Sequence, residues 1–259
     1  MPMHTTDDLD IRIEQAARII RQARQGVVLS GAGISTPSGI PDFRSEHSGL
    51  WQRHNPLEVA SLTAFRHQPE RFFEWVRPLL QDIINAQPNA AHHALAALQQ
   101  AGHFQGVITQ NIDGLHQKAG SHPVIEVHGS LATATCTGCY NTFPSDDFLP
   151  DFLTHGAIPH CPTCGSLLKP DVILFGEQLP WQTWKAAEQL TKTSDLMLIA
   201  GSSLAVMPAA RLPVEAANHG AAIIIVNQTP TYMDTRADVV LRGDVADILP
   251  RLAKRTLEP

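Results

Sequence analysis

Six short apolar runs recur along the chain, and each ends in glycine or in small polar residues. Runs of this length and composition are typical of strands that are buried on both faces of a sheet. Several are separated by segments of helical character, which predicts an α/β fold: a Rossmann-like, doubly wound parallel sheet. Ligands of such sheets bind beyond the carboxyl ends of the strands. The predicted strands are residues 27–29, 106–109, 124–127, 195–200, 221–226 and 238–241.

Helical patterns fill several intervals between these runs. Residues 9–25 place apolar side chains near helical spacing. Residues 57–84 are crowded with apolar and aromatic side chains, most of which we expect in the cores of helices. Asn89 is placed to cap an alanine-rich helix that runs to Gln100.

A shift in composition across residues 131–168 marks an insert. A chain of 259 residues can form one large domain, or one large domain with a smaller insert. We therefore predict a discontinuous sheet domain, a helical module with a cofactor loop, and a zinc-binding module. The sheet domain comprises residues 1–45, 86–130 and 168–259. The helical module comprises residues 46–85, and the zinc-binding module comprises residues 131–167.

Composition and charge narrow the classes of function. The formal net charge is −6 and no basic tract stands out, which disfavours direct binding of nucleic acid. The N-terminal segment lacks the basic start and apolar run of a secretory signal. Apolar runs fall far short of the ~20 residues that span a bilayer. We expect a cytoplasmic protein without a membrane partner; the pattern leaves the oligomeric state open, and a monomer is our expectation.

All four cysteines fall in two Cys-x-x-Cys pairs separated by 21 residues. Two thiolates on one tight turn, facing two on another, form a closed tetrahedral site for one structural Zn²⁺ per chain. Two disulfides or four unrelated thiols are the alternatives, and His160 is a less favoured alternative ligand. The predicted metal ligands are Cys136, Cys139, Cys161 and Cys164.

A glycine turn follows the first predicted strand at Gly31 and Gly33. Such a turn allows main-chain N–H groups to approach a pyrophosphate closely. It departs from the G-x-G-x-x-G dinucleotide fingerprint, because Thr36 occupies the third glycine position. From the residues alone, a nucleotide loop and an unliganded tight turn both remain open.

Polar residues follow the other predicted strands. Taken singly, Asn111 and Asp113 are more typical of turn formation than of ligand binding, and a lone His128 is usually structural. Together with Gly201-Ser202-Ser203 and Asn227, however, they fall at successive strand ends. One cleft would collect all of them.

With these motifs in place, the sequence resembles the sirtuins, the NAD-dependent protein lysine deacylases, and among them the compact bacterial type. The resemblance runs in family order over nearly the whole chain. The matching stretches are 31–35 (GAGIS), 39–44 (GIPDFR), 109–116 (TQNIDGLH), His128-Gly129, the four cysteines, 175–177 (FGE), 201–204 (GSSL) and Asn227.

The resemblance implies that NAD is a co-substrate and that acyl-lysine is the second substrate. The acyl oxygen would attack C1′ of the nicotinamide ribose, nicotinamide would leave, and His128 would then act as general base on the ribose hydroxyls. The products would be free lysine, nicotinamide and O-acyl-ADP-ribose. The implied catalytic residues are His128 and Asn111.

The resemblance also implies a set of cofactor contacts. Phe43 would cover the nicotinamide ribose, Arg44 would meet phosphate, and Asp113 would accept from the carboxamide. The full set is Gly31, Ala32, Gly33, Thr36, Phe43, Arg44, Gln110, Asn111, Ile112, Asp113, His128, Gly201, Ser202, Ser203, Asn227, Asp244 and Val245.

An extended substrate peptide would pair with two flanking segments, while its acyl-lysine enters an apolar tunnel. The implied substrate residues are Val172, Phe175, Gly176, Glu177 and Val206.

Sirtuins that prefer succinyl-lysine or malonyl-lysine resemble one another in carrying a Tyr-x-x-Arg pair beside this tunnel. Here Val76 and Leu79 are expected at those two positions, which favours acetyl, with tolerance of propionyl or butyryl, over succinyl. A shift of two positions would bring Arg77 to the tunnel instead.

Three other functions compete with the deacetylase. Protein mono-ADP-ribosyl transfer shares the glycosidic chemistry and would be separated from deacetylation by product analysis. A non-catalytic module that binds NAD or acyl-lysine is disfavoured by the presence of His128, Asn111 and Asp113. A hydride-transferring dehydrogenase would be revealed by the absorbance change of its nicotinamide.

Overall fold

The computed structural model describes residues 6–43 and 49–258. Its main sheet has six strands in the order β3-β2-β1-β7-β8-β9, and every neighbouring pair is parallel. The predicted doubly wound sheet is therefore confirmed. The strands are β1 (Gly26–Ser30), β2 (Phe104–Thr109), β3 (Val124–Glu126), β7 (Leu196–Ala200), β8 (Ala222–Asn227) and β9 (Val239–Arg242).

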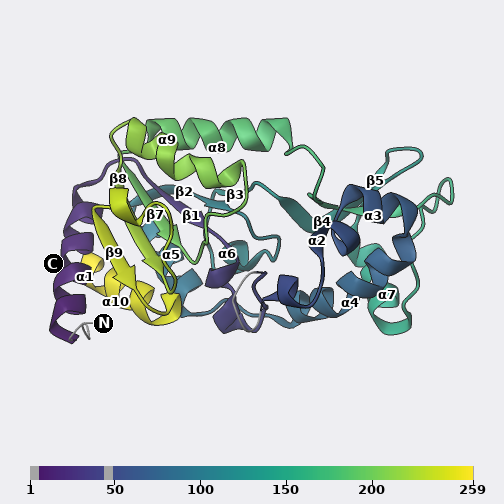
Figure 1. Ribbon diagram of the computed structural model, residues 1–259, viewed down its shortest axis with the longest axis horizontal. Coiled ribbons are helices and arrows are strands. Elements are labelled where there is room, and N and C mark those ends of the chain that lie inside the picture. Colours follow the sequence, from purple (N-terminus) through teal and green to yellow (C-terminus); the bar gives the residue numbers. More distant parts are fainter. Residues whose placement is uncertain (1–5, 44–48, 259) are drawn as a thin grey trace.

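Helices cover both faces of this sheet (Figure 1). Alternate residues of the strands pack against helices on opposite sides: Val28 of β1 belongs to one core, and its neighbours Val27 and Leu29 belong to the other. Burial on both faces explains why the strands read as continuous apolar runs. One face carries α1 (Thr6–Gln22), α5 (Ala90–Gln100) and α10 (Val245–Leu257); the other carries α8 (Trp181–Thr193) and α9 (Leu212–Asn218).

The first and last helices, α1 and α10, lie side by side at one end of the molecule (Figure 1). Arg251 pairs with Asp10 at 2.6 Å, and Arg255 pairs with Glu14. Among the described residues, no helix is long and apolar enough to cross a membrane.

A smaller part lies at the other end of the molecule (Figure 1). It contains a three-stranded antiparallel sheet in the order β5-β4-β6, where the insert was expected. Its strands are β4 (Gly129–Cys136), β5 (Thr142–Pro144) and β6 (Leu168–Val172), and its helices are α2 (Pro56–Val59), α3 (Leu62–His67), α4 (Pro69–Asn85) and α7 (Leu149–His155).

The expected helical and zinc-binding modules share one apolar core. Phe72 and Phe73 of α4 pack in the same cluster as Phe152 of α7 and Val172 of β6. The Phe73 and Phe152 rings meet edge to face, with centroids 5.4 Å apart. This shared core holds residues 56–85 against residues 129–172.

The apolar segment 57–84 forms three helices, two of which begin at polar caps and the third, α4, at Pro69. The Asn55 side chain accepts from the Leu57 N–H at the start of α2, and Ser61 accepts from Ala64 N–H at the start of α3. The predicted cap of α5 is confirmed, because Asn89 Oδ1 accepts from the Ala91 N–H at 2.9 Å. The short helix α6 (Leu115–Lys118) follows β2.

Candidate active site

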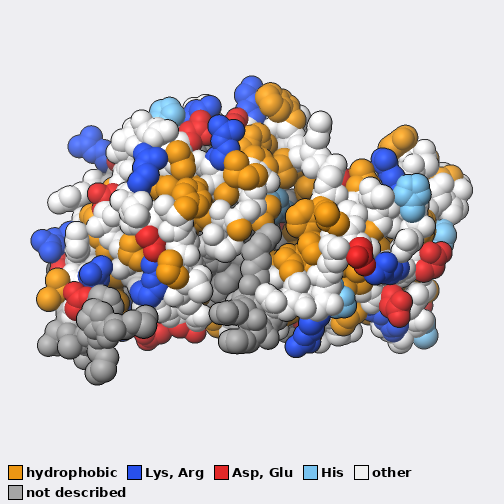
Figure 2. Space-filling view, in the orientation of Figure 1, with side chains coloured by type: hydrophobic (Ala, Val, Ile, Leu, Met, Phe, Trp, Pro, Cys, Tyr) orange, Lys and Arg blue, Asp and Glu red, His pale blue; other side chains and the backbone are white. Residues whose placement is uncertain are grey.

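Two connected cavities open at the carboxyl ends of β1, β2, β7 and β8. The first, of about 330 Å³, is lined by small and polar residues. The second, of about 540 Å³, is largely apolar and extends toward the smaller part. In the space-filling view, apolar side chains gather around the middle of the visible face of the molecule (Figure 2). The residues that line both cavities are Ala32, Phe43, Gln110, Asn111, His128 and Val206.

The glycine turn after β1 is packed main chain to main chain against the loop after β7. Gly33 N–H donates to the Gly201 carbonyl at 2.8 Å. A Cβ atom at Gly33 would lie 2.8 Å from that oxygen, and one at Gly201 would lie 2.3 Å from the Ile34 nitrogen. Glycine is therefore required at both positions by their mutual contact. For Gly33 the sequence had suggested another reason, the approach of a pyrophosphate. The contact places both loops on the wall of the polar cavity.

A buried polar network joins this turn to the loop after β2. Ser35 Oγ donates to Asp113 Oδ2 at 2.6 Å, and Asn111 Nδ2 donates to Ser35 Oγ at 3.0 Å and to the Gly31 carbonyl at 3.2 Å. Asp113 also accepts from the Leu115 N–H, at the first residue of α6, at 2.9 Å. Asn111 and Asp113 are thus both turn formers and cavity-lining residues, so the two readings of these side chains are compatible.

His128 lies at the junction of the two cavities. Its Nδ1 is 3.0 Å from the Gln110 carbonyl oxygen, which can only accept a hydrogen bond. Nδ1 therefore carries the ring proton, and Nε2 is the basic nitrogen of the neutral ring. Gly129 permits this placement: its φ is +79°, and a Cβ there would lie 2.0 Å from the Asp171 carbonyl oxygen.

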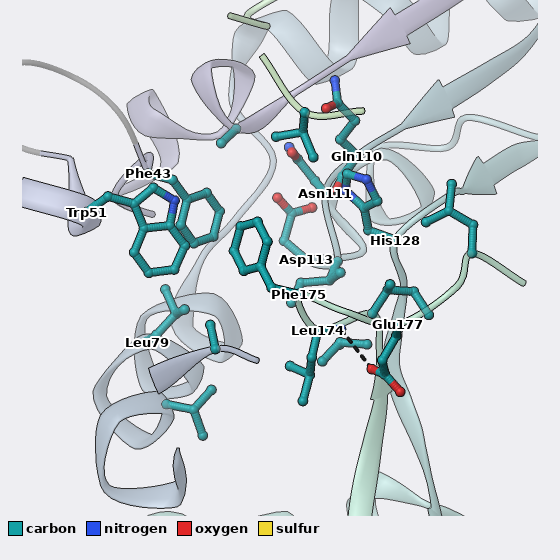
Figure 3. A pocket seen from close by; sticks show the side chains of 18 of the residues that line it. Phe43, Trp51, Leu79, Gln110, Asn111, Asp113, His128, Leu174, Phe175 and Glu177 are labelled. Carbon is teal, nitrogen blue, oxygen red and sulfur yellow. Dashed lines mark hydrogen bonds between the residues drawn. The ribbon is translucent and has the colours of Figure 1, made fainter. Parts of the chain in front are cut away.

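Aromatic and aliphatic side chains form the wall of the second cavity (Figure 3). The rings of Phe43 and Trp51 stack with centroids 5.0 Å apart, and Trp75 stacks on Trp51 at 5.9 Å. Val76 and Leu79 of α4 also line this wall. No lysine or arginine is among the described residues that line it.

Arg77, the alternative candidate at this wall, is directed toward α7. Its guanidinium donates to the Leu153 carbonyl at 2.6 and 3.1 Å and to the Thr154 carbonyl at 3.0 Å.

The loop after β6 forms another wall, and Glu177 braces it. Glu177 Oε2 accepts from the Leu174 N–H at 2.8 Å (Figure 3). The same carboxylate oxygen pairs with Lys169 Nζ at 3.0 Å. Lys169 Nζ in turn donates to the carbonyls of Pro170 and Val172 at 3.0 and 2.8 Å. Glu177 lines the cavity, but its carboxylate is engaged with its own loop.

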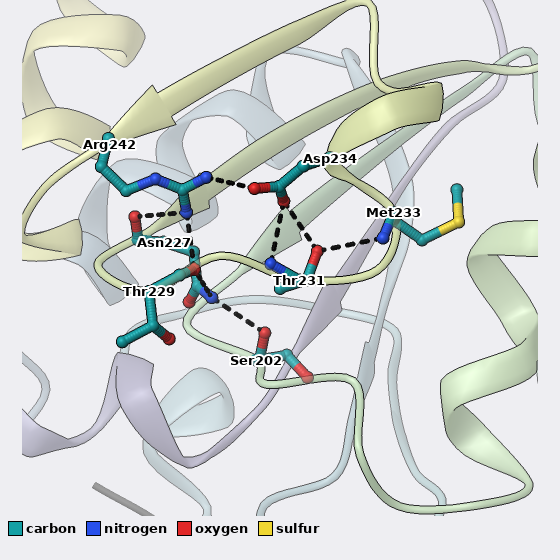
Figure 4. Close-up of polar contacts among 7 residues, drawn as sticks. All are labelled: Ser202, Asn227, Thr229, Thr231, Met233, Asp234 and Arg242. Carbon is teal, nitrogen blue, oxygen red and sulfur yellow. Dashed lines mark hydrogen bonds and ion pairs between the residues drawn. The ribbon is translucent and has the colours of Figure 1, made fainter. Parts of the chain in front are cut away.

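The far end of the polar cavity is held by a network around Asn227 (Figure 4). Asn227 Nδ2 donates to the carbonyls of Ser202 and Thr229 at 3.1 and 3.0 Å. Arg242 donates to the Thr229 carbonyl at 2.6 Å and pairs with Asp234. Arg242 thereby fixes the loop after β8, a role that depends on residues distant in sequence.

The four cysteine sulfurs lie within 4.8 Å of one another. The Cys136 and Cys164 sulfurs are 3.4 Å apart, and those of Cys139 and Cys161 are 3.6 Å apart. Four thiolates around Zn²⁺ at ~2.3 Å require sulfurs ~3.8 Å apart, so this set fits tetrahedral zinc. His160 is exposed and its Nδ1 lies 2.9 Å from the Gly165 carbonyl oxygen.

A family pattern described as the Sir2 family matches residues 31–208, a span that contains most of this cleft and all four cysteines. The chain belongs to the Sir2 family. It is similar to NAD-dependent protein deacylase 2 of Archaeoglobus fulgidus, with 44% identity over 247 residues that cover 95% of this chain and 96% of that protein.

Solved Sir2 structures superpose closely on this chain. One, described as the structural basis for the mechanism and regulation of Sir2 enzymes, has 44% identity and a TM-score of 0.91 and covers 95% of this chain and 98% of its own. Another is an ADP-ribose complex of a variant Sir2 homologue, with 38% identity, a TM-score of 0.87 and coverage of 94% and 96%.

The Sir2 cleft of this chain contains most of the residues expected from the sequence. Arg44 lies outside the described residues. Asp244 is adjacent to the cavity lining at Val245, but its side chain caps α10 by accepting from the Ala246 N–H at 2.8 Å. Sequence reasoning assigned no separate role to Ser35, although it lies inside the GAGIS motif, and it missed Gln228, which lines the polar cavity.

Proposed function

We propose that this protein is an NAD-dependent protein lysine deacetylase that transfers the acetyl group of acetyl-lysine to ADP-ribose and releases nicotinamide and O-acetyl-ADP-ribose. One observation carries the proposal: His128 stands where a polar cavity meets an apolar one, with its Nδ1 proton committed to the Gln110 carbonyl. Such an imidazole can remove a proton from a ribose hydroxyl on one side while an acyl-lysine occupies the other. Family membership supports the assignment.

The lining of the polar cavity suits NAD. The main chain of the 31–33 turn and the hydroxyls of Thr36, Ser202 and Ser203 would meet the pyrophosphate and the adenosine half. Gln110 Nε2 donates to Ser202 Oγ at 2.9 Å, so the ribose-binding amide is already oriented. The ADP-ribose complex of the similar Sir2 homologue supports this placement.

Asn111 and Asp113 would hold the nicotinamide end. Both side chains are buried and fixed by Ser35, so little order has to be gained when the cofactor binds. Bound NAD supplies an electrophilic ribose carbon and nicotinamide as the leaving group. Phe43, which lines both cavities, would keep water away from that carbon.

The apolar cavity suits a short, neutral acyl group. Val76 and Leu79 line it and Arg77 is bonded elsewhere, so none of these three residues offers a partner to a distal carboxylate. Main-chain groups near Phe175, Gly176 and Val206 would pair with the extended substrate peptide. We propose acetyl as the preferred group, with tolerance of propionyl and butyryl.

The wider organisation follows the same reasoning. We propose a structural zinc at the four cysteines and the division into a sheet domain, a helical module and a zinc-binding module that the sequence predicts. Four cysteines without disulfides, gathered at metal-ligand distances, favour a reducing compartment and hence the cytoplasm. The monomeric state stays a prediction from the sequence.

Mono-ADP-ribosyl transfer is the second candidate, because it would use the same polar cavity. The apolar cavity beside His128 favours deacetylation, since ADP-ribosyl transfer to a protein does not require an acyl tunnel. The test is mass spectrometry of one acetyl-lysine peptide incubated with the protein and NAD. Deacetylated peptide with one O-acetyl-ADP-ribose per nicotinamide is expected.

Two variants serve as controls for that experiment. His128→Ala should lower the rate of product formation ~10²- to 10⁴-fold, whereas the exposed and remote His219→Ala should not change it. Nicotinamide release accompanied by ADP-ribosylated protein and intact acetyl-lysine would replace the proposal by the second candidate.

A further inference from the structure

Two buried histidines lie behind the catalytic loop. His92 of α5 has no exposed surface and His116 of α6 is 1% exposed. Their rings meet at a steep angle with centroids 4.9 Å apart. Burial lowers the pKa of His116 to about 3, and the nearby His92 lowers it further. Burial also lowers the pKa of His92 to about 4. The charge of Asp113 raises that second pKa, and His93 lowers it. Both rings are therefore neutral at physiological pH.

The hydrogen bonds of the two rings decide which nitrogen carries each proton. The Asn89 N–H donates to His92 Nδ1 at 3.4 Å, so the His92 proton is on Nε2. Ser30 Oγ donates to Thr109 Oγ1 at 2.8 Å, so it can only accept from His116 Nε2, also at 2.8 Å. The His116 proton is then on Nε2, and its Nδ1 is an acceptor.

The remaining nitrogen of each ring is buried, and neither has a hydrogen-bond partner among the described residues. They are complementary: His92 Nε2 is a donor and His116 Nδ1 is an acceptor, on rings that touch. Neither nitrogen bonds to the other in this structure, so His92 supports His116 through the contact of the two buried rings.

These hydrogen bonds continue to the main chain of residues 109–111, next to His128. Thr109 Oγ1 also accepts from the Asn111 N–H at 3.1 Å. Gln110, between these two residues, holds His128 Nδ1 through its carbonyl. Ser30 and Thr109 are paired in register at the ends of β1 and β2, so their hydroxyls fasten the start of the loop to the sheet.

We propose that His116, supported by His92, is a positioning residue: through Ser30 and Thr109 it holds the main chain that orients Asn111 and His128. The proposal rests on the proposed deacetylase function for its kinetic consequence, but the tautomers and bonds it requires exist independently of any reaction. No part of His116 touches the cavities, so its effect is on geometry alone.

The kinetic experiment compares three variants. His116→Phe keeps an aromatic ring, of slightly larger size, and removes both nitrogens. In folded protein, kcat for deacetylation should fall ~10- to 100-fold, while KM for the peptide stays within ~3-fold. His116→Gln, which can return a donor to Ser30, should recover most of the loss. His93→Phe, an exposed neighbour on α5, should change nothing.

A double-mutant cycle tests the connection. If His116 acts through Ser30, then Ser30→Ala should lower kcat similarly, and the double variant should be no worse than either single variant. Additive losses, or a kcat for His116→Phe within twofold of the wild type, would overturn the proposal.

A measurement on the wild-type protein keeps the proposal testable if the variants fail to fold. Histidine-selective ¹⁵N NMR should show His92 and His116 as neutral Nε2–H tautomers from pH 5 to 8. An Nδ1–H tautomer or an ordinary titration at His116 would refute the bonding scheme. If the wild type binds ADP-ribose and shows these tautomers but does not deacetylate, the proposed function fails and the bonding scheme survives.

Discussion

Gly201 offers the sharpest test of how the 31–33 turn and the loop after β7 pack against each other. Its φ of +59° is unfavourable for any residue with a Cβ, at a cost of ~1–2 kcal/mol. In Gly201→Ala the new methyl would also lie 2.3 Å from the Ile34 nitrogen and 2.6 Å from the Gly33 carbonyl carbon. These are main-chain atoms that cannot rotate away, so overpacking adds ~1–3 kcal/mol. The expected loss of unfolding free energy is ~2–5 kcal/mol.

Gly220→Ala is the matched control. Gly220 has a φ of +89°, but a Cβ there would meet nothing within 4 Å. It should cost only the backbone term, ~1–2 kcal/mol. Comparing the two variants isolates the clash between the loops from the strain of the left-handed conformation.

The assay is urea unfolding of both variants, together with KM for NAD measured well below the unfolding transition. Gly201→Ala should be less stable than Gly220→Ala and should raise KM for NAD at least ~10-fold, because relief of the clash displaces the 31–33 turn from the polar cavity. Gly220→Ala should leave KM unchanged. Equal destabilisation by the two substitutions, or an unchanged KM in Gly201→Ala, would refute the reasoning that the loops depend on this contact.

Four further predictions follow from the site and its surroundings. His128→Ala should lower kcat ~10²- to 10⁴-fold while calorimetry shows NAD affinity within ~3-fold, and near-normal turnover would exclude the general-base role. Cys136→Ala should abolish the one zinc per chain found by elemental analysis and lower the melting temperature; a metal-free variant of full stability would contradict a structural zinc. On one peptide, kcat/KM for succinyl-lysine should be at least ~10²-fold below that for acetyl-lysine, because burial of an unpaired carboxylate costs several kcal/mol. Leu79→Arg should reduce this difference in kcat/KM between the two acyl groups. His92 and His116 have pKa values in the folded protein below the ordinary ~6.5, so protons bind more readily to the unfolded chain below that pH. The free energy of unfolding should therefore be unaffected by these groups above pH ~6.5 and fall by up to ~1.4 kcal/mol per pH unit per histidine toward pH 4. Urea unfolding at pH 7 and 5 should show this loss, and His116→Phe should lessen it.

Much of the cofactor half could be predicted from local patterns. A strand buried on both faces must be apolar throughout, so the runs that became β1, β2, β7 and β8 stand out without any knowledge of their partners. Parallel strands end at one edge of the sheet, so the polar residues after them had to converge. The Asn89 cap of α5 and the paired cysteines are equally local, because each depends on residues a few positions apart.

The apolar cavity was harder to predict, because its walls come from segments distant in the chain. The Trp51 ring contacts the rings of Phe43, Trp75 and Phe175. Nothing in the spacing of these aromatic residues along the chain indicates that they line one cavity. The resemblance placed Val76 and Leu79 beside the tunnel, but only the contact of Arg77 with residues of α7 showed why that arginine does not enter it.

By itself, the sequence determined the elements, their polarity and the chemistry available at each strand end, because hydrophobic period, caps and ligand spacing act over a few residues. Tertiary structure alone decided why Gly33 and Gly201 must be glycines, which His128 nitrogen carries the proton, and how His116 is bonded to Ser30. Each of these depends on one atom of a distant segment, 18 to 168 positions away in the chain, at contact distance. A linear pattern of residue types carries no distance between such atoms; only the packing of the folded chain sets it.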